Sequence, residues 1–204
     1  MKVIILPNED KTPEENEKNA ALKLVGYPII YHVISLFEKK GFSEFIICDN
    51  SKGNKIKTAL LEVAHALAGL KITIMNVNPD DKKSEILKKC KDFVLEEAFF
   101  VAPNDVTTNI DVEKMLSYHK QNARLATVCI AEEKKHYVPL SFDKAGRCEC
   151  KIINSGFYVF EPEIFDYMSE GHPLDPNVLM RVAEDDELTV FSSNGFVERC
   201  IIEI

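Results

Sequence analysis

The sequence predicts an α/β protein with three layers, α/β/α, around a mostly parallel, doubly wound sheet and with a small antiparallel hairpin inserted late in the chain. Three observations support this fold class. Short β-rich runs alternate with helical patterns, which is typical of βαβ units. The early β-rich runs are apolar throughout, as expected of strands that are buried on both faces. Near residue 140 the alternation gives way to a hairpin pattern.

Four apolar runs in the first half of the chain are the expected parallel strands. They cover residues 2–6, 44–49, 71–77 and 98–103. Crossover connections return each strand in the same direction, so we expect all four strands to end on one rim of the sheet. Their expected last residues are Leu6, Asp49, Val77 and Pro103.

Helical patterns fill the intervals between these strands. Apolar residues recur at three- and four-residue spacing, as Ile30, Val33 and Phe37 do. Asn109 or Asp111 is the expected N-cap of the fourth helix. The expected helices cover residues 29–40, 55–70, 84–95 and 111–122.

The second half of the chain predicts a mixture of elements. Residues 138–142 and 147–152 flank the turn sequence Asp143-Lys144-Ala145-Gly146 and are expected to form an antiparallel hairpin. The sequence shows no linker and no internal repeat, so we expect a single domain over residues 1–204. The other expected elements are strands at 126–130, 156–160, 188–192 and 198–204, and short helices at 163–169 and 177–184.

Composition and charge exclude several classes of function. The net charge of −8 argues against a nucleic-acid partner, which would require a basic stripe. The lysine clusters at residues 52–57 and 82–91 lie beside acids and are expected to be solvated helix faces. No apolar run approaches the ~20 residues that cross a bilayer, and the first residues lack the pattern of a secretory signal. We therefore expect a cytoplasmic protein without a membrane partner.

The six cysteines and two of the histidines are expected to be structural. Cys148 and Cys150 lie one residue apart and could ligate a metal, but no second CxxC or histidine pair accompanies them. His32 and His119 fall on expected helices, where a surface or hydrogen-bonded histidine is the simpler interpretation. We expect all the thiols to be reduced, with Cys48, Cys129 and Cys200 inside apolar strands.

A polar segment, PNEDKTPEENEKNAALKLVGYP, separates the first strand from the first expected helix. It is far longer than the usual connection of about two to six residues. In doubly wound folds the loop after the first strand binds phosphates. Residues 7–22 contain no glycine, and five acids outnumber two lysines over residues 8–18. We therefore expect this segment to be mobile or displaced, and not to form a phosphate cradle.

Four stretches follow one another in a recognisable order: MKVIIL, LVGYPIIYHVISLFEKKGFSEFIICDN, EEAFFVAPNDVTTNIDVEKML and INSGFYVFEPEIFDYM. Together they resemble the sugar-1-phosphate nucleotidyltransferases, or sugar-nucleotide pyrophosphorylases, and the glucose-1-phosphate cytidylyltransferases in particular. The fourth stretch, which matches the family pattern I-N-x-G-F-(F/Y)-V-(F/L)-E-P, is the most specific. The resemblance covers most of the chain. It implies a nucleotidyltransferase, GT-A-like fold and a Mg²⁺-dependent reaction of an NTP with a sugar 1-phosphate.

The resemblance also implies particular site residues. Asp105 takes the position of a metal-binding aspartate, where a carboxylate at the end of a strand can hold Mg²⁺ against phosphate oxygens. The alternative is that Asp105 starts an Asx turn. Asn154 and Gly156 match substrate-binding positions, although turn formation explains Asn154 equally well. Glu198 and Glu203 are nearby carboxylates that could complete a metal site, and neither is preferred.

The loops that should bind phosphate depart from the family pattern. The family's glycine-rich G-G-x-G-T-R-L loop is replaced by Pro7-Asn8-Glu9-Asp10-Lys11-Thr12-Pro13, in which proline removes amide donors. Within this alignment Thr12 is the implied substrate-binding position. Lys18 could supply the catalytic basic charge of the K-P-K element. The base-reading Thr-Gly-Gly element reads roughly Lys83-Ser84-Glu85, and the E-K-P stretch before INSGF is missing.

Two hypotheses follow. One is an active transferase that binds a nucleotide, a sugar phosphate and Mg²⁺. The other is a catalytically inactive relative that serves as a binding or assembly partner. The missing glycines, arginine and E-K-P stretch favour the second hypothesis, whereas Asp105 and the INSGF stretch keep the first one open. Either hypothesis is compatible with a homo-oligomer.

Overall fold

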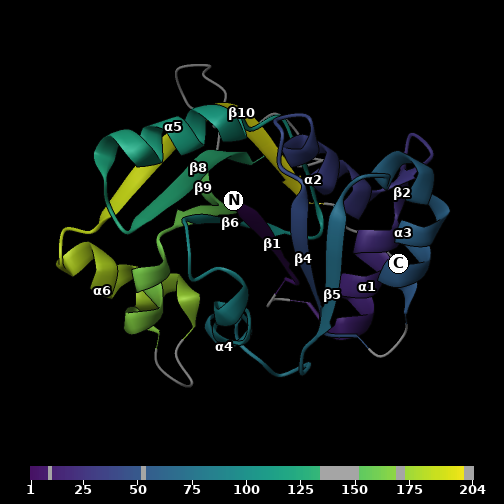
Figure 1. Cartoon of the computed structure of the whole chain (residues 1–204), viewed down its shortest axis with the longest axis horizontal. Coiled ribbons are helices and arrows are strands. Elements are labelled where there is room, and N and C mark those ends of the chain that lie inside the picture. The colour runs from purple at the N-terminus through teal and green to yellow at the C-terminus, as the bar shows by residue number, and fades with distance from the viewer. Residues whose placement is uncertain (9–10, 52–53, 134–151, 169–172, 200–204) are drawn as a thin grey trace, which may run out of the picture.

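The computed structural model describes residues 1–8, 11–51, 54–133, 152–168 and 173–199 (Figure 1). Within these ranges an eight-stranded sheet runs in the order β5-β4-β1-β6-β9-β8-β10-β7, and β2 and β3 form a separate small hairpin. The strands are β1 Lys2–Leu6, β2 Lys23–Leu24, β3 Tyr27–Pro28, β4 Glu44–Asp49, β5 Lys71–Asn76, β6 Phe99–Pro103, β7 Val106–Thr108, β8 Ala126–Glu133, β9 Ile152–Phe160 and β10 Leu188–Arg199.

The prediction of a mostly parallel sheet is confirmed. β4 pairs in parallel with β5 and β1, and β1 pairs in parallel with β6. Leu6 lies opposite Pro103 and Asp49 lies opposite Asn76, so these strands end on one rim as expected. β9 runs antiparallel to β6 and β8, and β7 runs antiparallel to β10. We call the edge at the carboxyl ends of β1, β4, β5 and β6 the carboxyl rim.

Helices cover both faces of the sheet, which confirms the three layers. The α-helices are α1 Pro13–Ala21, α2 Ile29–Glu38, α3 Lys55–Glu62, α4 Lys83–Lys89, α5 Val112–Asn122 and α6 Leu179–Glu184. Helices α2, α3 and α5 contribute to one buried cluster, whereas α4 and α6 contribute to the other. Figure 1 shows α2 and α5 on one side of the sheet and α4 and α6 on the other.

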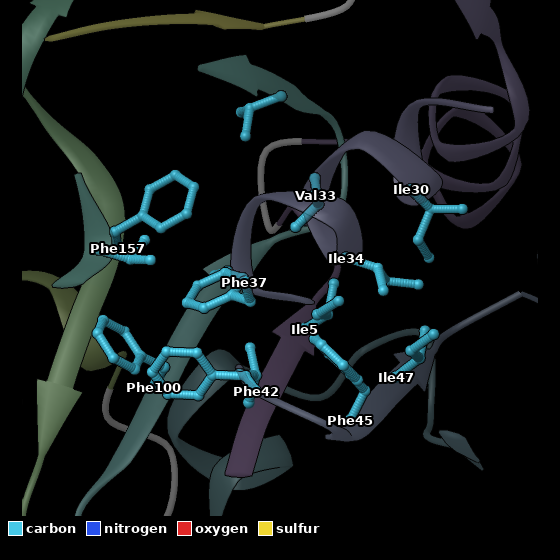
Figure 2. Close-up of a cluster of buried hydrophobic side chains, with 14 of the residues drawn as sticks. Ile5, Ile30, Val33, Ile34, Phe37, Phe42, Phe45, Ile47, Phe100 and Phe157 are labelled. Carbon is cyan, nitrogen blue, oxygen red and sulfur yellow. The ribbon is translucent and has the colours of Figure 1, made fainter. Parts of the chain in front are cut away.

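Alternation along β1 divides these two cores. Val3 and Ile5 belong to the cluster under α2 and α3, and Ile4 and Leu6 belong to the cluster under α4. Figure 2 shows the first cluster, in which the ring of Phe37 lies among other aromatic rings. Its ring centroid is 5.1 Å from that of Phe100, 5.6 Å from that of Phe42 and 6.2 Å from that of Phe157.

The segment at residues 7–22, which we expected to be mobile or displaced and not a phosphate cradle, forms the capped helix α1 over most of its length. Thr12 is the N-cap: its hydroxyl accepts a hydrogen bond from the amide of Glu15 at 3.3 Å, and the Glu15 carboxylate accepts one from the Thr12 amide at 2.8 Å. Pro13 begins the helix, where its missing N–H is not needed. The helix then packs against α2 and α3.

Several element boundaries differ from the prediction. The helices expected at 55–70 and 84–95 end early and continue as short 3₁₀ turns, η1 Ala64–Leu67 and η2 Lys91–Phe93. The helix expected at 163–169 is a 3₁₀ helix, η3 Pro162–Tyr167, and a π-helical turn, η4 Leu174–Val178, precedes α6. The strand expected at 188–192 continues to Arg199 as β10, whose pairing with β8 is irregular between Ser192 and Phe196. Residues 200–204 of the last expected strand lie outside the described residues.

Some predictions lie outside the described residues. The expected hairpin at 138–152 lies outside them except for Ile152, and so does the possible metal-ligating pair Cys148 and Cys150. The thiol of Cys200 and the candidate metal ligand Glu203 lie outside them as well. In the described ranges Cys48, Cys90 and Cys129 are buried free thiols, and burial raises the pKa of Cys129 to about 11. No helix in the described part of the chain is long and apolar enough to span a bilayer.

Candidate functional site

The loops on the carboxyl rim enclose a polar cleft of about 290 Å³. The loop after β1 contributes Pro7, Asn8 and Lys11, and the loop after β4 contributes Asn50. The loop between β5 and α4 contributes the other polar walls, Asp80, Asp81 and Lys82. The cleft therefore carries both lysines and carboxylates, which is an environment suited to a polar ligand.

A narrow cavity of about 10 Å³ continues the cleft toward β9 and β10. Pro7 and Asn8 line both spaces. The narrow cavity adds Lys83, Gly156 and Arg199, so residues from three distant parts of the chain meet there. We call the cleft and the narrow cavity together the rim site.

Asp105 lies beside the rim site with its side chain 1% exposed. Its Oδ2 atom accepts a hydrogen bond from Nδ2 of Asn8 at 3.1 Å, and its Oδ1 atom lies 3.5 Å from Nη1 of Arg199. The pairing of β7 with β10 explains the second contact, because Arg199 lies opposite Val106 in that ladder. Both carboxylate oxygens therefore contact distant side chains rather than the local backbone of an Asx turn.

The donor set around Asp105 does not fit a divalent cation. Mg²⁺ takes oxygen ligands in octahedral geometry, and one or two protein carboxylates with phosphate oxygens and waters commonly supply them, so the decisive point is whether Asp105 has a free carboxylate oxygen. In the described ranges no group of three or more His, Cys, Asp or Glu side chains is arranged to hold a metal. Oε2 of Glu198, one of the two candidate second ligands, lies 3.5 Å from Oγ1 of Thr107. The described part of the site offers a single carboxylate that is already in contact with a guanidinium.

In the described part of the loop after β1, the backbone amides form hydrogen bonds within the protein. The amide of Asn8 donates to Oδ1 of Asn16, and Nδ2 of Asn16 donates back to the carbonyl of Asn8, both at 2.9 Å. The Lys11 amide donates to the Asn8 carbonyl at 3.3 Å, and the Thr12 amide is taken by Glu15. These amides are consequently not free to turn toward a phosphate, unlike those of a glycine-rich cradle.

The other predicted site residues fall in different places. Thr12 caps α1 and Lys18 is exposed in the last turn of α1, where a cation faces the negative end of the helix. Lys11, which the alignment passed over as a site residue, lines the cleft.

Asn154 and Gly156 form a turn within β9. The Gly156 amide donates to Oδ1 of Asn154 at 3.0 Å, and Nδ2 of Asn154 donates to the hydroxyl of Tyr158 at 3.0 Å. Gly156 has a φ of +81°, which glycine adopts without strain, and a Cβ at this position would lie 3.4 Å from Cγ of Pro103. The stretch therefore forms a local turn that places Gly156 against the rim site, and substrate binding by Asn154 and Gly156 stays a prediction.

Both histidines are hydrogen-bonded, as expected. His119 is 1% exposed, with Nδ1 2.8 Å from Oγ1 of Thr127 and Nε2 3.2 Å from Oε1 of Glu161. Burial lowers the pKa of His119 below its ordinary value of 6.5, against the opposing effect of the Glu161 carboxylate. Nε2 of His32 lies 2.9 Å from the carbonyl oxygen of Leu24.

Sequence reasoning missed Asn8, Asn16 and Arg199. Asn8 and Asn16 belong to a segment that we expected to be displaced, and no motif identified them. Arg199 is separated from Asp105 by 94 residues. Only the pairing of β7 with β10, which the sequence did not predict, brings the two charges together.

A doubly wound sheet with a polar cleft on the carboxyl rim of its parallel strands places the chain among the open-sheet α/β proteins, in which ligands commonly bind at this rim. Residues 14–187 match the family of nucleotidyl transferases, and the chain belongs to this family. The chain is 26% identical over 198 residues to a probable glucose-1-phosphate cytidylyltransferase of Bacillus subtilis, covering 84% of this chain and 78% of that protein. It is 23% identical over 204 residues to the glucose-1-phosphate cytidylyltransferase of Salmonella typhimurium, covering 86% and 79% of the two chains.

Solved structures share the fold. HddC from Yersinia pseudotuberculosis, complexed with GMP-PN, superposes with a TM-score of 0.72 at 17% identity, covering 98% of this chain and 94% of that one. A putative glucose-1-phosphate thymidylyltransferase from Bacillus anthracis superposes with a TM-score of 0.68 at 15% identity, covering 96% and 87% of the two chains. These likenesses confirm the nucleotidyltransferase fold that the resemblance implied.

Proposed function

We propose that this chain is a cytoplasmic member of the nucleotidyl transferases that binds a nucleotide or a sugar phosphate at the rim site and does not transfer the nucleotidyl group at a useful rate. The observation that supports this proposal most directly is the structure of the loop after β1. Its amides are hydrogen-bonded within the protein, by Asn16 and by the Thr12 and Glu15 capping box. The described residues of this loop, which leave out 9 and 10, supply no set of free N–H donors to a triphosphate.

The chemistry of the reaction makes this loss severe. A sugar phosphate attacks the α-phosphorus in line, and the protein acts by positioning the groups and stabilising the charge that develops. Removing a single such stabiliser commonly costs about 10² to 10³ in rate. The first turn of α1 adds Glu14 and Glu15, whose charges offset the positive end of that helix. The losses are not additive within one site, but one or two of them suffice.

Binding is a separate property, and the cations of the rim site support it. Lys11 and Lys82 line the cleft, and Lys83 and Arg199 line the narrow cavity. The relatives are named for the nucleotides and sugar phosphates on which they act, and a phosphorylated ligand of this class is the natural occupant of the rim site.

The test measures binding and turnover on the same purified chain. We expect glucose 1-phosphate or one of the common NTPs to raise the melting temperature, and we expect no measurable pyrophosphate release from the pair in Mg²⁺. Lys11→Ala should reduce the thermal shift, whereas Lys57→Ala, an exposed lysine of α3, is the matched control and should not. Pyrophosphate release near one turnover per second would refute the proposal that the chain is catalytically inactive.

The second candidate is an active transferase. Asp105 favours it, because this carboxylate lies at the end of β6 beside the rim site, where the family places a metal ligand. In that case turnover should require Mg²⁺ and disappear in Asp105→Ala. A chain that neither turns over nor responds to any nucleotide or sugar phosphate would instead support the role of assembly partner, alone or as a homo-oligomer.

A further inference from the structure

Asp105 is a buried carboxylate with a cationic neighbour supplied by a distant strand. Burying a charge is costly unless the charge is paired and hydrogen-bonded. The contacts described above meet this need. The side-chain amide of Asn8 donates a hydrogen bond to one carboxylate oxygen, and the Arg199 guanidinium lies near the other. Asp105 is 1% exposed and Arg199 is 30% exposed, so the carboxylate is enclosed while the guanidinium remains accessible.

A divalent cation at Asp105 would compete with this arrangement. It would lie next to the guanidinium, and two positive charges beside one carboxylate repel each other. It would also have to displace the contacts with Asn8 and Arg199 that occupy the two carboxylate oxygens of Asp105. The positive charge that the family obtains from Mg²⁺ is therefore already present at Asp105 as a side chain.

The contact with Asp105 uses only part of the hydrogen-bonding capacity of the Arg199 guanidinium. Arginine carries five N–H donors in a planar fork that matches phosphate oxygens, and the contact with Asp105 engages one nitrogen of Arg199. Arg199 also lines the narrow cavity together with Lys83 and Gly156. The narrow cavity has room for about one water molecule, so a phosphate would lie in the adjoining cleft of about 290 Å³, with which the narrow cavity shares Pro7 and Asn8.

We propose that Arg199 replaces the divalent cation of the family, and that it binds the phosphate of a phosphorylated ligand at the rim site without a metal. Asp105 then orients Arg199 and holds no metal. This inference rests on the proposed binding function for its ligand and on the Asp105 geometry for the exclusion of the metal. It makes Asp105 a positioning residue and Arg199 a binding residue.

The first experiment measures the affinity for glucose 1-phosphate by calorimetry on the full chain, once with Mg²⁺ and once with EDTA. We expect the same dissociation constant in both buffers. Arg199→Gln should weaken binding about tenfold or more, because hydrogen bonds to charged groups contribute on that scale. Arg124→Gln is the matched control, since Arg124 also pairs with an aspartate, Asp186, on the exposed surface, and it should bind as the parent does.

Arg199→Lys is a second variant that keeps the test valid if Arg199→Gln fails to fold. It keeps a cation beside Asp105 but loses the planar fork, so it should weaken binding less than Arg199→Gln does and still measurably. The inference is overturned if both folded variants bind as tightly as the parent. It is also overturned if binding by the parent requires Mg²⁺.

The second experiment tests the exclusion of the metal by itself. Mn²⁺ is titrated into the parent and into Asp105→Asn, and free Mn²⁺ is followed by electron paramagnetic resonance. We expect the two titrations to coincide. A stoichiometric loss of free Mn²⁺ in the parent that is absent in Asp105→Asn would overturn the inference. If neither glucose 1-phosphate nor any of the common NTPs binds, the proposed function fails, and this titration still decides the metal question.

Discussion

Two buried asparagines near the loop after β1 and the end of β6 differ in what their amides contact. Asn16 is 1% exposed and bonds to both backbone groups of Asn8. Asn104 is 0% exposed, and neither its Oδ1 nor its Nδ2 has a hydrogen-bond partner within the described ranges. Buried polar groups are nearly always paired, and an unpaired group keeps its desolvation cost. The same residue type should therefore contribute to stability with opposite signs at the two positions.

Alanine substitutions test this difference. Asn16→Ala should lower the free energy of unfolding by about 1–3 kcal/mol, because it leaves the Asn8 amide and carbonyl without their partner. Asn104→Ala should leave the free energy of unfolding unchanged or raise it. Urea unfolding of both variants measures the two changes, and equal losses at the two positions would contradict the prediction.

His119 makes the stability depend on pH in a predictable direction. Burial lowers its pKa below 6.5, so between the folded and unfolded pKa values the unfolded chain binds more protons than the folded one. The stabilisation from neutral His119 is therefore present above about pH 6.5 and is lost as the pH falls below that value. We expect His119→Gln to show a flatter decline of melting temperature between pH 7 and pH 5 than the parent, and parallel curves would argue against this assignment.

At the scale of single elements, α1 is the clearest case of local encoding. The sequence Thr12-Pro13-Glu14-Glu15 carries a threonine and, three residues later, a glutamate, which is the pattern of a capping box. The hydrogen bond from the Thr12 amide holds the pKa of Glu15 below its ordinary value. Oε1 of the buried Glu17 accepts a hydrogen bond from the backbone amide of Lys55 at 2.6 Å, so α1 also covers the start of α3.

Replacement of the cap measures its contribution. Thr12→Ala should lower the free energy of unfolding by about 1 kcal/mol, whereas Thr12→Ser keeps the hydroxyl and should stay close to the parent. Chemical denaturation is the measurement. Equal effects of the two substitutions would show that the hydroxyl does not cap α1.

At the scale of the whole molecule, an aromatic cluster joins the parallel half of the sheet to β9. Phe37 of α2 lies against Phe100 of β6 and Phe157 of β9 (Figure 2). Since β9 runs antiparallel to β6, these contacts hold together strands that the chain reaches more than fifty residues apart. Phe37 is fully buried, so its loss would leave a cavity at this junction.

Truncation of Phe37 should therefore destabilise the entire fold. Phe37→Ala is expected to lower the free energy of unfolding by about 3–5 kcal/mol, the usual cost of removing a buried phenylalanine. Phe93→Ala, at an exposed ring, is the control and should cost much less. A small effect of Phe37→Ala would mean that the cluster is not a single packed core.

Much of the fold could be predicted because its information is local. The boundaries of β1 and β4 follow from short apolar runs, and the apolar spacing of α2 shows its buried face. The capping box of α1 was equally local.

The rim site depended on information that the sequence does not display. Sequence alone placed Asp105 at the end of a strand, and the structure adds that Asn8 and Arg199 meet it from 97 and 94 residues away. The contact with Arg199 requires that β7 forms and pairs with β10 in one register. The sequence by itself therefore determined the parallel strands and their helices, the carboxyl rim and the loss of the glycine-rich loop. Only the tertiary structure decided which charge stands beside Asp105, because strand register is settled by packing across the whole sheet.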